Sequence, residues 1–149
     1  MKIKHTKIGH PKVILKPWGR EIWFANQKEY AGKILVIEKG HRYSLQYHER
    51  KKETQYLLSG KIKLSIGDEK SKKTVETGSK LRFITLLPGD SIDILPGTIH
   101  RAEALRKSRI LEVSTNDLDD VVKLDDDYGR SGKGNNFKLD TALAKRRKK

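Results

Sequence analysis

The stretch SLQYHERKKETQYLLSG runs from Ser44 to Gly60. Its alternation of apolar and polar residues, together with its Tyr, Leu and Thr content, is typical of β-strands. Strands that enter a core usually bury Val, Ile and Leu, but this stretch can place Gln46, His48 and Glu53 on one inward face. Either these three groups face water, or something inside the fold compensates their burial.

These polar residues have the chemistry of a metal site. Gln46 and His48 are two residues apart, so on a strand they point to the same side. Glu53 follows a short loop and can return beside them, and the segment PGTIH (Pro96–His100) supplies a second histidine. An amide oxygen, two imidazoles and a carboxylate suit a divalent metal, zinc in the first place or manganese, iron, cobalt or nickel. Taken singly, each of these residues is more typical of a surface position.

Short β-like segments alternate with turn-like glycines as far as residue 115. The segments predicted as strands are Glu21–Asn26, Lys33–Lys39, Tyr43–His48, Glu53–Ser59, Lys61–Gly67, Lys73–Glu76, Arg82–Leu86, Ser91–Ile94, His100–Ala104 and Arg109–Thr115. Ser59–Gly60 is predicted as the corner of a tight hairpin. Many short strands at regular spacing, without a sustained helical period, predict an all-β, single-domain fold, an antiparallel sandwich or barrel of the jelly-roll kind.

The length of 149 residues fits one domain with a hydrophobic core. We expect an N-terminal arm at residues 1–15, a barrel with a closing C-terminal arm at residues 16–130, and a basic, flexible tail at residues 131–149. The tail combines the polar run SGKGNN with the basic run AKRRKK, a composition that favours disorder over a packed helix.

The composition limits the possible partners. The chain has 33 Lys and Arg, 19 Asp and Glu, and no cysteine, so a metal must take nitrogen and oxygen ligands. Apolar runs are too short for a membrane span and no signal peptide is visible, so we expect a cytoplasmic protein with no membrane partner. The net charge is +14, but the sequence lacks the recognition patterns of nucleic-acid binding, so that function is unsupported. A basic pocket would suit a phosphorylated small molecule equally well.

Two separated motifs resemble the conserved motifs of cupins. The first consists of Gly40, Gln46-x-His48, Glu53 and Gly60, with Gln where many cupins have His; the second consists of Gly89, Pro96-Gly97 and His100. Five longer segments together resemble the type II mannose-6-phosphate isomerase domain: KPWGRE (Lys16–Glu21), GHRYSLQYH (Gly40–His48), PGTIHR (Pro96–Arg101), ILEVST (Ile110–Thr115) and DDVVKLDDDYGR (Asp119–Arg130).

The resemblance implies a cupin jelly-roll barrel and a metal-dependent isomerase that interconverts mannose 6-phosphate and fructose 6-phosphate through an enediol. It carries the metal ligands over as Gln46, His48, Glu53 and His100. Jelly-roll domains of this size often pair through sheet edges, so we also expect a homodimer.

An isomerase of this kind needs a base that moves the proton and residues that bind the phosphate. Glu112 is the candidate base, with a solvated strand carboxylate as the alternative. Arg130 is a second candidate catalytic residue, and Arg101, Arg42 and Lys33 are candidate substrate-binding residues. For the arginines, a surface salt bridge is the alternative.

The run RKKETQ (Arg50–Gln55) departs from the family pattern. Arg50 and Lys51 stand where the family has His and Arg, and Gln55 stands at an aromatic position, although Glu53 is kept. Two further hypotheses therefore remain open: another metal-dependent cupin activity on a sugar or sugar nucleotide, and a non-catalytic sugar-binding cupin.

Overall fold

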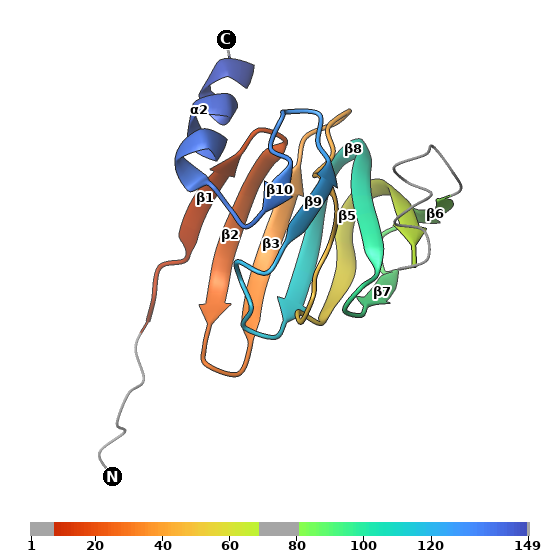
Figure 1. The fold of residues 1–149 in the computed structure, drawn as a ribbon, viewed down its shortest axis with the longest axis horizontal. Helices are drawn as coiled ribbons and strands as arrows, with labels where there is room; N and C mark the ends of the chain where they lie inside the picture. The colour runs from red at the N-terminus through yellow and green to blue at the C-terminus, as the bar shows by residue number, and fades with distance from the viewer. Residues whose placement is uncertain (1–7, 69–80, 149) are drawn as a thin grey trace.

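Ten strands and one helix make up the described part of the computed structural model, which covers residues 8–68 and 81–148 (Figure 1). The elements are β1 (Lys12–Lys16), β2 (Gly19–Asn26), β3 (Ala31–Ile37), β4 (Leu45–Tyr47), β5 (Glu53–Gly67), β6 (Arg82–Leu86), β7 (Ser91–Ile94), β8 (Ile99–Ser114), β9 (Val122–Asp125), β10 (Gly132–Lys133) and α2 (Phe137–Arg147). The predicted strand Lys73–Glu76 lies outside the described residues. Within them, no helix has the length and apolar character needed to cross a membrane.

All strands pair antiparallel in one curled sheet. The path is β1-β2-β3-β8-β4-β9-β10, and β5 pairs with β6, β7 and β8. β5 and β8 have 15 and 16 residues, so each runs through both halves of the curl and joins them. The predicted all-β, single-domain architecture is confirmed.

The hairpin predicted at Ser59–Gly60 is wrong, because β5 continues through it as one strand beside β8. Gly60 instead marks an irregularity in the β5–β8 register, with a φ of 97°. A Cβ there would lie 2.2 Å from Ser108 Oγ, so the two backbones approach too closely for any other residue. The bend lets both long strands change direction together.

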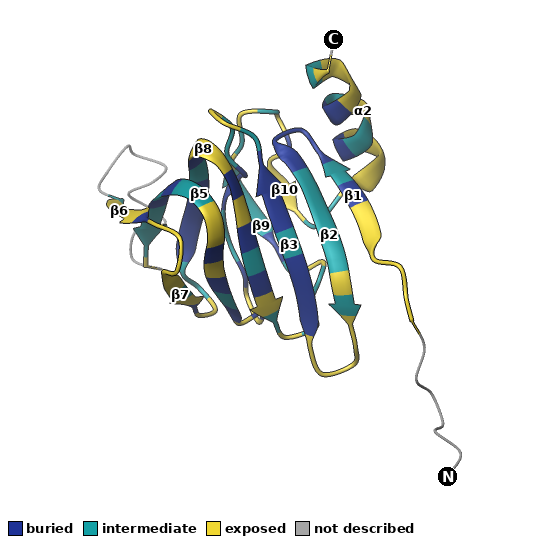
Figure 2. Ribbon diagram, turned by 180° about the vertical axis from the view of Figure 1, so that it is seen from behind, coloured by how far each residue is buried: buried dark blue, intermediate teal, exposed yellow. Residues whose placement is uncertain are grey.

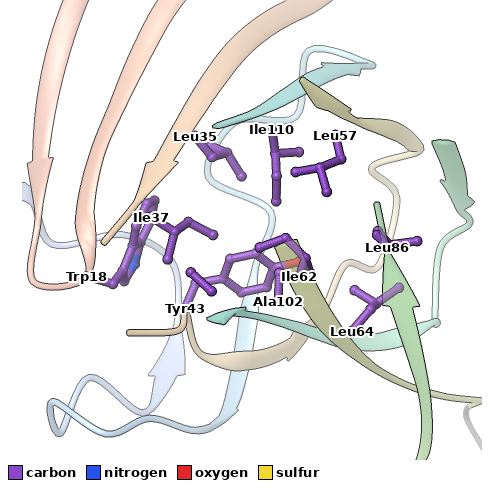
Figure 3. Close-up of a cluster of buried hydrophobic side chains, with 11 residues drawn as sticks. Trp18, Leu35, Ile37, Tyr43, Leu57, Ile62, Leu64, Leu86, Ala102 and Ile110 are labelled. Atoms are coloured by element: carbon purple, nitrogen blue, oxygen red, sulfur yellow. The ribbon is translucent and has the colours of Figure 1, made fainter. Parts of the chain in front are cut away.

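The inward face of the sheet has an apolar end and a polar end. Alternation places Leu35 and Ile37 inward from β3, and the same side of that strand carries Lys33 nearer the other end. Alternating burial along β5 and β8 is visible in Figure 2. The apolar end forms the core (Figure 3), built from Trp18, Leu35, Ile37, Tyr43, Leu57, Ile62, Leu64, Leu86, Ala102, Ala104 and Ile110.

The chain ends are more ordered than predicted. Residues 12–15 of the expected arm belong to β1, and the expected flexible tail contains β10 and the helix α2. Asn136 caps the helix by accepting a hydrogen bond from the Leu139 N–H at 3.0 Å. Asp140, in the first turn, is 2% exposed and lies 2.7 Å from Lys16 Nζ and 3.0 Å from Arg130 Nη1. The Lys16–Asp140 ion pair and the edge-to-face contact of Phe137 with Trp23 hold this segment beside β1 and β2.

We expect Asp140→Asn to lower the melting temperature by about 5–10 °C, because it removes the carboxylate shared by two buried cations. Lys16 and Arg130 keep Glu21 and Asp126 as partners, which limits the loss. Thermal unfolding followed by circular dichroism measures the change. Lys138→Gln, an exposed charge removal on the same helix, should leave the melting temperature nearly unchanged. Equal melting temperatures for the two variants would show that α2 is not docked through Asp140.

Candidate metal centre

Three of the four predicted metal ligands meet inside the barrel. His48 follows β4, Glu53 begins β5 and His100 lies near the start of β8. His100 Nε2 is 3.3 Å from Glu53 Oε1, and His48 Nε2 is 3.6 Å from Glu53 Oε2. One ligand atom from each residue falls within 4.8 Å of the others, and all three residues are buried. The structure thus joins residues that lie far apart in the sequence.

Backbone carbonyls fix both imidazoles in the form that binds metals. His48 Nδ1 donates to the Asp120 carbonyl, and His100 Nδ1 donates to the Thr98 carbonyl at 2.9 Å. Because a carbonyl only accepts, each Nδ1 carries the hydrogen and each Nε2 presents a bare lone pair. The two Nε2 atoms and Glu53 Oε2 are buried and have no hydrogen-bond partner among the residues that the structure describes.

Unsatisfied buried acceptors of this kind cost about 1–3 kcal/mol each, and three in one place would be unusual without compensation. A divalent cation among them would satisfy all three at once. The donor set of two imidazoles and a carboxylate is one that such cations prefer. The residues present therefore fit a metal ion.

Lys51 and Gln55 link Glu53 to a second buried carboxylate, Glu112. Lys51 Nζ lies 2.9 Å from Glu112 Oε1 and 2.8 Å from Glu53 Oε2, although the latter approach lacks hydrogen-bond geometry. Gln55 Nε2 lies 3.0 Å from Glu53 Oε1 and 3.3 Å from Glu112 Oε2. Of the two alternatives for Glu112, the structure shows the inward one. The run around Lys51 reads as a surface loop in sequence, so no local signal predicted a buried ammonium there.

Burial and neighbouring charges shift the pKa values of His48, Glu53 and Glu112 in different directions. Burial lowers the pKa of His48 to about 4, so the imidazole is neutral. Burial alone would raise the pKa of Glu53, but Lys51 and the imidazoles outweigh it and hold that pKa well below its usual range. Burial, and then the Glu53 charge, raise the pKa of Glu112. Of the two carboxyls, Glu112 is therefore the one that takes up a proton first.

Asp120 organises the loop between His48 and Glu53. Its carboxylate accepts hydrogen bonds from the backbone N–H groups of Glu49, Arg50 and Lys51, at 3.1, 2.7 and 2.8 Å. Its own carbonyl orients His48. One residue of the C-terminal arm thus positions a candidate metal ligand and the loop that carries Lys51, a role that the sequence did not reveal.

A polar cavity of about 60 Å³, large enough for a few water molecules, reaches the candidate centre at His48. Its walls come from the barrel and from the C-terminal arm, and include Gln46, His48, Lys51, Glu112, Lys123 and Arg130.

Comparison with solved structures identifies the fold. An RmlC-like cupin from Shewanella frigidimarina matches with a TM-score of 0.58 and 14% identity, over 76% of this chain and 91% of that chain. Oxalate decarboxylase from Bacillus subtilis matches with a TM-score of 0.62 and 16% identity, over 80% of this chain and 33% of that one. The chain has the cupin fold. The capsular polysaccharide assembling protein CapF from Staphylococcus aureus matches with a TM-score of 0.58 and 13% identity, over 85% of this chain and 33% of that one.

The chain spans about a third of the length of the last two proteins. No protein-family model matches the sequence, and no curated protein matches it significantly. The likenesses show the fold alone, so the resemblance to type II mannose-6-phosphate isomerases stays a prediction.

Gln46, the fourth predicted ligand, lies on the cavity wall directly across the β4–β8 pair from His100. Its Oε1 accepts a hydrogen bond from Ser44 Oγ at 2.7 Å. An amide oxygen has a second lone pair, so this bond leaves a ligand position open. Metal ligation by Gln46 remains a prediction.

The predicted substrate-binding arginines, Arg42 and Arg101, are not part of the cavity wall. Arg42 forms a two-bond pair with Asp127, with both distances 2.8 Å. Arg101 donates to the carbonyls of Tyr43 and Asp125 at 3.0 and 2.7 Å. Both guanidiniums join the barrel to the C-terminal arm, so the structure brings neither of them to the candidate metal centre.

Arg130 and Lys33 do line the cavity, and both have carboxylate partners. Arg130 Nη2 lies 2.7 Å from Asp126 Oδ1, in addition to its contact with Asp140. Lys33 Nζ lies 3.3 Å from Glu21 Oε2. Burial alone would raise the pKa of Glu21, but Lys33 and Lys16 outweigh it and lower that pKa to about 2.

We expect Glu21 to stabilise the protein by roughly 2–3 kcal/mol at neutral pH, and this contribution to fade in acid. Its folded-state pKa lies below the unfolded value, so the unfolded state protonates first as the pH falls from about 4.5 to about 2. The difference in unfolding free energy between the wild type and Glu21→Gln should therefore shrink across this range. Urea unfolding at several pH values measures it, with the exposed Glu29→Gln as control. A difference that is independent of pH would contradict the assignment.

Proposed function

We propose that this cupin is a metal-dependent enzyme that moves a proton between adjacent carbons of a sugar phosphate. The observation that carries the proposal is the set of three buried, unpartnered ligand atoms of His48, Glu53 and His100, next to a carboxyl with a raised pKa. The candidate reaction is the interconversion of mannose 6-phosphate and fructose 6-phosphate, which the sequence resemblance suggests.

His48, Glu53 and His100 would hold the metal, with Gln46 as the fourth protein ligand. When bound, the metal supplies Lewis-acid polarisation of a substrate oxygen. The carbonyls of Asp120 and Thr98 keep the two imidazoles oriented toward the shared position. Lys51 balances the negative charge of Glu53 and Glu112, so the site keeps both carboxylates buried together.

Glu112 is the group best placed to move the proton. An aldose–ketose interconversion removes a proton from the carbon next to the carbonyl and returns it to the neighbouring carbon, through an enediol. Glu112 lines the cavity, and its raised pKa brings it closer to the range in which a carboxylate both accepts and returns a proton. Lys51 and Gln55 fix both of its oxygens.

The cations around the cavity favour an anionic substrate. Lys123 has no carboxylate partner among the described residues; its ammonium donates to the Gly134 carbonyl. Burial, and then the nearby charges of Arg130 and Lys16, lower its pKa. A phosphate at this end of the cavity would relieve that repulsion. The cavity is smaller than the pockets that usually hold such ligands, so the C-terminal arm must move to admit a sugar phosphate.

The same small volume supports a second candidate function. A cavity of about 60 Å³ suits a metal and a substrate smaller than a sugar phosphate. A cupin enzyme acting on such a substrate would use the same three ligands, because the fold does not fix the reaction.

We expect protein purified without added metal to carry close to one divalent ion per chain, and His100→Ala to lower the affinity for that ion. The loss should exceed the 10–100-fold that is typical for an outer-shell partner. Elemental analysis and isothermal titration calorimetry measure both quantities, while circular dichroism checks the fold. His41→Ala is the matched control, because His41 contacts Tyr128 outside the candidate centre. Unchanged stoichiometry in His100→Ala would mean that the ligands are wrongly assigned.

The isomerase proposal makes a prediction about Glu112. With metal supplied, the wild type should interconvert mannose 6-phosphate and fructose 6-phosphate, and Glu112→Gln should reduce the rate by about 10²–10⁴-fold while retaining the metal. A coupled assay measures turnover, and nuclear magnetic resonance measures exchange of the transferred hydrogen with deuterated solvent. Glu49→Gln, an exposed carboxylate beside His48, is the control. If the metal-loaded wild type turns over neither sugar phosphate, the isomerase assignment falls and the second candidate remains.

A further inference from the structure

The central strands of the barrel reverse the usual polarity of a half-buried sheet. At the end that carries the candidate metal centre, the inward side chains include Lys33, Glu112 and Gln55. Alternation turns their sequence neighbours outward, and four of these, Ile34, Tyr56, Leu111 and Val113, are large and largely apolar. A polar interior at this end is explained by a ligand, whereas an apolar exterior requires a covering surface.

The outward apolar residues form a continuous line across five strands, which we call the outer row. Direct cross-strand pairs join its members, which are Val13, Ile22, Ile34, Leu111 and Tyr56. Val13 and Tyr56 are 53% and 39% exposed. No member is charged, although the chain has a net charge of +14.

Further apolar side chains extend the outer row along the same face. Phe24 and Val113 are 44% and 49% exposed, and Leu58 is 43% exposed. A Cβ on Gly32 would lie 2.5 Å from the Phe24 ring, so this ring lies directly over the strand and gives a flat surface. The outer row and these residues expose on the order of 500 Å² of apolar area, at the upper end of what a monomer leaves in one patch.

We propose that a second copy of this chain packs face to face on the outer row, forming a homodimer. A standard interface buries about 800 Å² on each partner, which the apolar patch and its polar rim can supply. Sheets pack in this way about 10 Å apart, with interdigitating side chains. The interface is thus the sheet face, not the sheet edges that the sequence suggested.

The charges beside the outer row select the orientation of the two copies. On one side, Arg20 and Arg109 flank Val36, and neither forms an ion pair with a described residue. Phe24 and Asp93 lie on the other side of the row. Asp93 pairs across the strands with Thr54, which in turn pairs with Val113. A two-fold axis across the strands sets the arginine side of one copy over the opposite side of its partner. The guanidiniums then meet an aromatic ring and a carboxylate, not each other.

Sedimentation velocity of the full chain tests this interface. The wild type should sediment as a dimer of twice 17.1 kDa. The double variant Tyr56→Lys/Val113→Lys should be a folded monomer, because both sites are exposed. The ammonium groups introduced at position 56 would face each other across the axis, and the one introduced at position 113 would lie over the arginine side of the partner. Phe83→Lys is the control: Phe83 is 62% exposed but lies on β6, away from the outer row, so this variant should stay dimeric. A monomeric wild type, or a dimer that survives the double substitution, would overturn the proposal.

A cross-link gives a second, independent test. The chain has no cysteine, so Ile34→Cys places a single thiol at the centre of the outer row. A short bismaleimide should link two Ile34→Cys chains in high yield and should leave Phe83→Cys chains unlinked. Equal yields from the two variants would refute the interface even if the wild type is dimeric.

Discussion

Two imidazole nitrogens and a carboxylate oxygen with no hydrogen-bond partner are buried together at the polar end of this barrel. This constraint explains much of the surrounding structure. The carbonyls of Asp120 and Thr98 fix the lone pairs of His48 and His100, and the Lys51 ammonium offsets the charge of the paired glutamates. A barrel built for stability alone would fill this position with apolar side chains. We propose that the polar groups that remain there hold a cation.

The same constraint separates the two ends of the barrel. The core includes Leu35, Leu57 and Ile110. Two residues along the same three strands, the inward side chains are Lys33, Gln55 and Glu112, which line the candidate site. Stability therefore comes mainly from one end and chemistry from the other. The C-terminal arm and the tail contribute to both, since Asp120 of the arm organises the site and Asp140 of the tail holds α2 on buried cations. On the outside, the apolar row of the same strands provides the surface that we assign to a second copy.

Local patterns in the sequence were enough to predict most strands and a shared face for His48 and Glu53, whereas His100 was added to them by the resemblance to the cupin motifs. Alternation fixes which side chains share a face, and the loop after His48 is short enough to return Glu53 to it. The long-range features were not predictable in this way. Nothing local distinguishes Lys51 from its solvated neighbour Lys52, because its burial depends on Glu112, far along the chain. The Gly60 bend and the α2 helix were likewise misjudged, since distant partners, Ser108 and Lys16, determine them.

Anomalous diffraction from crystals of the metal-loaded protein tests the central claim most directly. Data collected on both sides of the metal's absorption edge should show one strong peak, roughly 2.0–2.3 Å from His48 Nε2, His100 Nε2 and a Glu53 carboxylate oxygen. Electron density in which Lys51 and water alone fill this space, with no anomalous signal, would show that the buried lone pairs are compensated without a metal.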